Sequence, residues 1–270
     1  MKIIQKIPFR RMNFVPRFVI VSSPMRTGST WLVEMLRGII EVPDNLVANS
    51  IEQIEDLVGN GPAAGIIKSH QIVDLDWAGL SDSLPIVRLT RNYKDSLISR
   101  VLYAIHIRPN EGRGVGDDEL EDLVDTLGDF TDAEFVNAFF EQCPLVEKWL
   151  AEIVVHERGE SPQCVTLSYE AMMYNPYDQI RTLIHRFWPE SKDIIRRVDE
   201  TVRNSIRLGY SQRDTFLRRK AVGVGGWETW LTCKQSERID SLYFELRERA
   251  FQKSNLRAEE LIGGNVSSVA

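Results

Sequence analysis

The sequence predicts an α/β fold in which helices flank a central parallel sheet. Four short apolar runs are rich in β-branched residues and have no alternating polar face. Helical patterns follow three of these runs. Strands that are apolar on both faces and alternate with helices are typical of a parallel sheet covered by helices. The four expected strands are residues 17–23, 65–70, 84–91 and 163–170.

Each strand has a recognisable boundary. The first, RFVIVSS, ends at turn chemistry and leads into the helical pattern STWLVEMLRGII at residues 29–40. The second is GIIKSH, and the third, LPIVRLTR, leads into a helix over KDSLISRVLYAI. The fourth is QCVTLSYE, and the segments after it have helical periodicity. No repeat or low-complexity linker interrupts this order, so we expect one domain over residues 17–255, an N-terminal extension over 1–16 and a flexible C-terminal tail over 256–270.

Composition excludes several classes of protein. A length of 270 residues with 43% hydrophobic content is enough for one large α/β domain. The net charge of -6 and a pI near 5.4 argue against nucleic acid as a partner. No apolar run approaches the roughly 20 residues that span a bilayer. Cys143, Cys164 and Cys233 have no metal-ligand spacing, so we expect them to be packing residues in a reducing compartment, the cytoplasm.

The stretch SSPMRTGSTW, which begins at Ser22, has the layout of a phosphate-binding loop. It joins a strand to a helix through a tight turn, so backbone N–H groups and the helix N-terminus would face an anion. Against the pattern G-x-x-x-x-G-K-[ST], Gly28 and Thr30 fit, whereas Ser23 replaces the first glycine and Ser29 the lysine. That lysine contacts the β- and γ-phosphates of a nucleoside triphosphate, so its loss argues against ATP or GTP hydrolysis. The fold is therefore expected to be of the P-loop nucleotide-binding type, with Arg26 supplying the cation.

Five segments, taken together, resemble one family. RTGSTW is similar to the loop K/R-S-G-T-T-W, and RNYKDSLIS to R-N-P-K-D-x-x-x-S, with Tyr93 in place of proline. IKSH resembles a K-T/S-H strand end, and LSYEAMMYNP resembles Y-E-D-M-x-x-N-P, with Ala171 in place of aspartate. GGWETWLTCKQSERIDSLY resembles G-D-W-K-x-x-F-T-V-x-x-x-E-x-x-D. These segments occur in the order typical of sulfotransferases that use 3′-phosphoadenosine 5′-phosphosulfate (PAPS), in their cytosolic and bacterial forms.

The resemblance implies a site for PAPS and for its product, adenosine 3′,5′-bisphosphate (PAP). The phosphosulfate would lie on the backbone N–H groups of residues 27–31, and Arg26 would follow the charge that develops on the leaving phosphate. The basic run at Arg218 stands one or two residues further from Trp227 than in the family pattern. The expected donor-binding residues are, for the phosphosulfate, Arg26, Thr27, Gly28, Ser29 and Thr30; for the adenine, Trp31 and Tyr169; and for the 3′-phosphate, Arg91, Ser99, Arg218, Arg219 and Lys220.

The same resemblance implies the catalytic groups. His70 is the candidate base that removes the acceptor's proton, because an imidazole titrates near neutral pH. Lys68, two residues earlier on the same strand face, would hold the sulfuryl oxygens. No metal is expected. The acceptor is expected to be a hydroxyl, on a small molecule or tethered to a carrier, and steroids, phenols, glycans and lipids all remain open.

Two other functions fit parts of the sequence. The first is a P-loop kinase that phosphorylates a small metabolite, although neither its loop lysine nor a Mg²⁺-binding carboxylate is evident. The second is a non-catalytic nucleotide-binding protein of the same fold, against which His70, Lys68 and Arg26 together argue.

The sequence also bears on assembly. Members of the family that the sequence resembles often dimerise through the segment K-x-x-x-T-V-x-x-x-E. The matching segment here runs from Glu228 to Glu237, and it begins with an anion in place of the cation. Such a change can turn attraction across a twofold contact into repulsion, so a monomer is favoured over a dimer.

Overall fold

The computed structural model describes residues 17–42, 47–48, 64–70, 85–106, 118–158, 164–211 and 223–263. They belong to two compact units. The first unit lies within residues 1–92 and 159–224, and the second within residues 93–158 and 225–270.

The first unit contains a parallel sheet. Its described strands lie in the order β2-β3-β1-β4-β5, and every pair is parallel. The expected fold class, a central parallel sheet flanked by helices, is confirmed. Sequence reasoning missed only β2, whose two residues are too few to produce a periodic signal. The strands are β1 (Arg17–Ser22), β2 (Val47–Ala48), β3 (Ala64–Ser69), β4 (Ile86–Thr90) and β5 (Cys164–Ser168).

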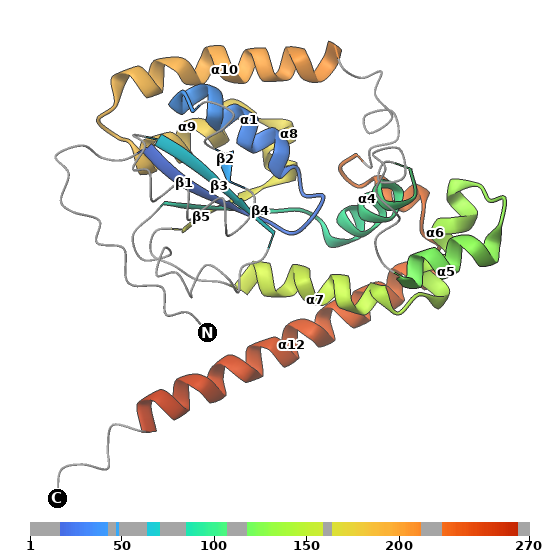
Figure 1. Cartoon of the computed structure of the whole chain (residues 1–270). Coiled ribbons are helices and arrows are strands. Elements are labelled where there is room, and N and C mark those ends of the chain that lie inside the picture. The colour runs from blue at the N-terminus through green and yellow to red at the C-terminus, as the bar shows by residue number, and fades with distance from the viewer. Residues whose placement is uncertain are drawn as a thin grey trace, which may run out of the picture. The chain divides into compact units, whose positions relative to one another are not determined.

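The described part of the first unit has four helices, and three of them, α1, α9 and α10, are drawn on the same side of the sheet (Figure 1). Their apolar residues recur every three or four positions and join those of the strands in one buried cluster. Leu32 and Leu36 of α1 are fully buried in it, together with Ile184 of α9 and Val198 of α10. The helices are α1 (Ser29–Ile40), α8 (Tyr169–Tyr174), α9 (Pro176–Phe187) and α10 (Lys192–Ser211).

The second unit is helical in its described part. Trp149 and Phe139 lie at its centre, with ring centroids 5.1 Å apart, and both are buried. The long helix α12 packs against α7 (Figure 1) and continues past residue 255, so the segment expected to be a tail begins as helix. The elements are α4 (Tyr93–His106), α5 (Asp118–Leu127), α6 (Asp132–Gln142), α7 (Leu145–Arg158), the 3-10 helix η3 (Gly226–Thr229) and α12 (Cys233–Gly263).

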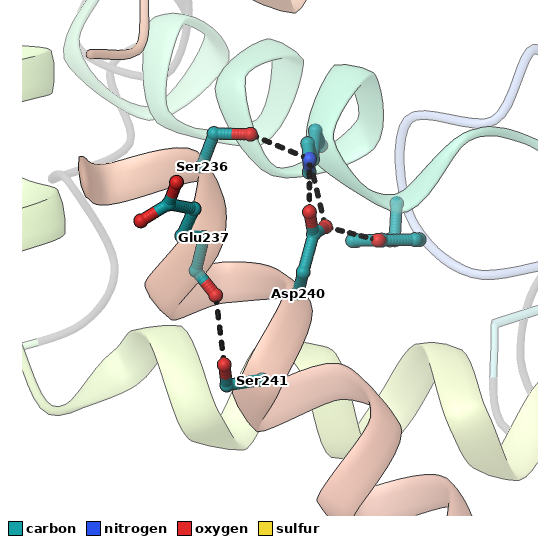
Figure 2. A network of polar contacts seen from close by, with 6 residues as sticks. Ser236, Glu237, Asp240 and Ser241 are labelled. Atoms are coloured by element: carbon teal, nitrogen blue, oxygen red, sulfur yellow. Dashed lines mark hydrogen bonds and ion pairs between the residues drawn. The ribbon is translucent and has the colours of Figure 1, made fainter. Parts of the chain in front are cut away.

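A polar network connects α4 to α12 in this unit. The buried Nζ of Lys94 donates to Ser236 Oγ at 2.6 Å and pairs with the Asp240 carboxylate at 2.7 Å. The hydroxyl of Tyr93 donates to the same carboxylate. Figure 2 shows Ser236 and Asp240 on one face of α12, directed toward the lysine nitrogen. Burial, followed by the hydrogen bond to Asp240, raises the pKa of the Tyr93 phenol, so its hydroxyl remains a donor.

The burial of the three cysteines agrees only in part with the expectation that they are packing residues. All three are free thiols, and Cys143 is buried in the second unit. Cys164 is half-buried on β5. The expectation that Cys233 is a packing residue is wrong, because this residue is exposed at the first position of α12.

Candidate active site

The loop between β1 and α1 is shaped by two residues with positive φ. Arg26 has φ 66° and Gly28 has φ 90°. A Cβ on Gly28 would lie 2.6 Å from the ring of Tyr169, so only glycine fits both the backbone conformation and the space. The hydroxyl of the buried Thr27 donates to the carbonyl of Pro24 at 2.9 Å and closes the turn.

The N-terminus of α1 is suited to an anion. Its N-cap is Gly28, which makes no side-chain hydrogen bond, and the first turn holds no acidic residue. Its first N–H groups have no partner within the helix, and the helix dipole makes this end positive. Ser29 is buried and Thr30 exposed, so the expected hydroxyls differ in their surroundings.

Two cations add to this positive end. The Nζ of Lys68, near the end of β3, donates to Thr30 Oγ1 at 3.0 Å. Burial, and then the nearby charge of Arg26, lowers the pKa of Lys68. Like charges held close together in the absence of an anion are mutually unfavourable, and an anion between them removes that cost. The residues present therefore fit a phosphate or sulfate group.

His70 follows β3 and lies beside the end of β1. The two strands pair in register through Ser22 and Ser69, and the backbone N–H of Ser23 donates to the Ser69 carbonyl at 3.1 Å. This register brings Nδ1 of His70 to 2.9 Å from the carbonyl oxygen of Ser23. A carbonyl only accepts, so Nδ1 carries the proton and the neutral ring has its lone pair on Nε2. His70 is exposed, which suits a group that meets an acceptor.

Arg91 follows β4 and contacts the loop. Its side chain is buried, and Nη1 donates to the carbonyl oxygen of Arg26 at 2.8 Å. The guanidinium lies over the ring of Tyr169, 4.5 Å from the centroid. Tyr169 thus contacts both Gly28 and Arg91, two positions far apart in the sequence. The next residue, Glu170, accepts a hydrogen bond from the backbone N–H of Asn92 at 2.8 Å.

The structure describes two of the remaining expected residues, Trp31 and Ser99. Trp31, on α1, is partly buried and donates through Nε1 to Ser205 Oγ of α10 at 2.6 Å. Ser99 is buried on α4 in the second unit. The basic run Arg218, Arg219 and Lys220 lies outside the described residues.

Sequence reasoning missed three contributors to the site, namely the Ser23 carbonyl, Glu170 and Ser205. Ser23 and Glu170 lie within matched segments, but a motif does not show that a backbone carbonyl or a distant partner gives them a role, and Ser205 lies outside every matched segment.

The fold is that of a P-loop-type α/β protein, and the N-terminus of α1 is suited to an anion. The family model of the sulfotransferase domain matches residues 16–253, across both compact units. The chain therefore belongs to the sulfotransferase family and is an enzyme that transfers a sulfuryl group. This assignment replaces both the kinase and the non-catalytic alternative.

Solved structures show the same fold. A mouse sulfotransferase, SULT7A1, complexed with PAP, aligns with a TM-score of 0.61 and 17% identity, over 90% of this chain and 89% of that one. A retinol dehydratase in complex with androsterone and the inactive cofactor PAP aligns with a TM-score of 0.50 and 14% identity, over 86% and 80%. No curated protein matches the sequence.

Two features are absent from the part of the chain that the structure describes. Within the described residues, no three His, Cys, Asp or Glu side chains are grouped as a metal site would require. Across the same part of the chain, no helix is both long and apolar enough to cross a membrane.

Proposed function

We propose that this sulfotransferase transfers the sulfuryl group of PAPS in line to a hydroxyl acceptor, with His70 as the general base. The observation that carries this proposal is the bond between His70 Nδ1 and the Ser23 carbonyl, because it leaves the lone pair on Nε2. The family assignment supplies the reaction class, and the shared fold with PAP complexes supports the nucleotide.

The donor supplies an activated sulfuryl group whose leaving group is a nucleotide phosphate. The loop is suited to this charge, since the N–H groups of residues 27–31 and the cations Arg26 and Lys68 surround one helix N-terminus. Arg26 stabilises the charge on the leaving phosphate, and Lys68 holds the sulfuryl oxygens. Ser29 and Thr30 contribute hydroxyls, and the bond from Lys68 to Thr30 keeps the amine beside the loop.

His70 removes the acceptor's proton at Nε2 as the hydroxyl attacks sulfur. The Ser23 carbonyl keeps the ring in one orientation and stabilises the positive charge that the ring acquires. Because Ser23 lies in the loop that binds the donor, the bond also keeps the base at a fixed position relative to that loop.

The nucleotide is held by groups from several elements. Trp31 packs on the adenine face, and Tyr169 contacts its edge. The 3′-phosphate is bound by Arg91 and Ser99, and the basic run Arg218, Arg219 and Lys220 adds positive charge there. The bond from Trp31 to Ser205 supports the first assignment because it fixes the plane of the indole.

The proposal also covers the compartment, the oligomeric state and the acceptor of the enzyme. Three free thiols are consistent with a reducing compartment, and we place the enzyme in the cytoplasm. It acts as a monomer on a small-molecule or carrier-tethered hydroxyl.

The decisive experiment measures release of PAP from PAPS with a panel of alcohols, phenols and amines. We expect turnover with hydroxyl acceptors and none with ATP as the donor. In parallel, thermal shifts with PAP, 5′-AMP and ATP report the nucleotide preference. A charged hydrogen bond contributes about 1.5–3 kcal/mol, so PAP should bind at least about tenfold more tightly than 5′-AMP. Equal affinities would contradict the 3′-phosphate assignments, and turnover with amines alone would contradict the hydroxyl.

A further inference from the structure

The Arg91 side chain makes a contact that binding of a 3′-phosphate does not require. Nη1 donates to the carbonyl oxygen of Arg26 at 2.8 Å, in the loop that would bind the other end of the donor. The same guanidinium lies over the Tyr169 ring, which in turn packs against Gly28. Arg91 therefore contacts the anion-binding loop both directly and through Tyr169.

The Arg26 carbonyl belongs to the same peptide unit as the Thr27 N–H. Peptide groups in the described chain are all trans, so this C=O and this N–H point in opposite directions. Fixing the carbonyl toward Arg91 directs the Thr27 N–H away from it. The Thr27 N–H is the first of the backbone donors assigned to the phosphosulfate.

The backbone at Arg26 needs such support. A residue with a Cβ at φ 66° is strained by about 1–3 kcal/mol, and it stays in that conformation only when its surroundings hold it there. The bond from Arg91 is one such support, and the ring of Tyr169 limits where the guanidinium can lie. A guanidinium has five N–H donors, so this bond is compatible with phosphate contacts by the same group.

We infer that Arg91 is a positioning residue for the anion-binding loop, orienting the peptide between Arg26 and Thr27, in addition to contacting the 3′-phosphate. The inference rests on the proposed function and adds to it. The inference has a specific consequence. Loss of Arg91 weakens the binding even of nucleotides that have no 3′-phosphate, because the same loop binds their 5′-anion.

The test compares Arg91→Met with Ser99→Ala, using PAP and 5′-AMP as ligands and calorimetry to measure Kd. Ser99 is the matched control because it is assigned to the 3′-phosphate and lies outside the loop. We expect Arg91→Met to raise the Kd of both nucleotides by about tenfold or more, which is the effect of losing a charged hydrogen bond. Ser99→Ala should weaken PAP only. If Arg91→Met weakens PAP and leaves 5′-AMP within about twofold of wild type, the inference is overturned.

A second, milder variant keeps the inference testable if Arg91→Met does not fold. Arg91→Lys keeps a cation for the phosphate but loses the planar group that lies over Tyr169 while bonding to the loop. At saturating PAPS we expect its kcat to fall by about tenfold while its preference for PAP over 5′-AMP is retained. A kcat within about twofold of wild type also overturns the inference. Wild-type protein that binds neither nucleotide overturns the proposed function, and the positioning role with it.

Discussion

Nδ1 of His70 lies 2.9 Å from the carbonyl oxygen of Ser23, so the candidate base is held by the backbone of the loop that would bind the donor. The contact depends on the in-register pairing of β1 with β3. A one-residue change in that register would direct the ring to the other face of the sheet. The position of the base therefore depends on the pairing of β1 with β3 as well as on the histidine itself.

His70→Ala should remove most of the transfer activity while PAP affinity stays near wild type. Loss of a general base typically lowers the rate by about 10²–10⁴, and the base acts on the acceptor rather than on the nucleotide. His70→Asn is the matched control, because its amide can still donate to Ser23 but has no basic nitrogen. Steady-state turnover and calorimetric PAP binding are the measurements. A third of wild-type turnover in His70→Asn would assign the base elsewhere.

PAP binding should be accompanied by proton uptake at Lys68. Burial and Arg26 lower its pKa, and a bound anion raises that pKa again. Between the lowered pKa and the ordinary lysine value, the unfolded chain holds more protons than the free enzyme, so stability rises with pH there. Calorimetry in two buffers of different ionisation enthalpy, at a pH inside that window, measures the uptake. Lys68→Met should abolish it, and identical heats for the wild type in both buffers would refute the idea.

Gly28→Ala should destabilise the fold and abolish nucleotide binding. The new Cβ combines strain at φ 90° with a 2.6 Å contact to the ring of Tyr169, a total cost of about 2–5 kcal/mol. Gly128→Ala isolates the strain, because its φ is 63° and nothing lies within 4 Å of the added atom. It should cost about 1–2 kcal/mol and leave binding intact. Urea denaturation gives both values, and equal losses would show that the Tyr169 contact is unimportant.

Asp95→Ala should lower the free energy of unfolding by at least about 2 kcal/mol. The carboxylate is fully buried and accepts from the backbone N–H groups of Gly225 and Trp227, both at 2.9 Å. Its removal leaves two N–H groups without their acceptor. Asp118→Ala, at an exposed position of α5, is the control and should change stability by no more than about 0.5 kcal/mol. Similar losses of stability for both variants would argue that the two hydrogen bonds accepted by Asp95 do not stabilise the fold.

Light scattering at micromolar concentration should report a monomer. In the segment that resembles a dimerisation motif, Thr232 caps α12, exchanging hydrogen bonds with Gln235 at 2.9 and 3.3 Å. The match of Thr232 to the motif therefore has an explanation within one chain. Glu228 and Glu237 are both exposed, so a twofold contact there would face anion against anion. A dimer that Glu237→Lys dissociates would contradict this prediction.

The sequence alone determined the fold class, four of the five described strands and the loop with its helix. These features depend on local patterns, namely apolar runs, turn residues and the spacing of Gly28 and Thr30. The same patterns identified His70, Lys68 and Arg91 as strand-end residues, and a resemblance to sulfotransferases gave them roles. The basic run at Arg218 is still known only from its sequence.

The tertiary structure decided which groups meet. The contacts of Arg91 with the Arg26 carbonyl, and of His70 with Ser23, join segments that are 65 and 47 residues apart. They depend on strand order and register, which are set by the packing of the whole sheet and have no signature in any one segment. Backbone carbonyls also carry no residue identity, so a sequence pattern cannot single them out. The exposure of Cys233 was misjudged for a related reason, because composition does not show which face of a helix is covered.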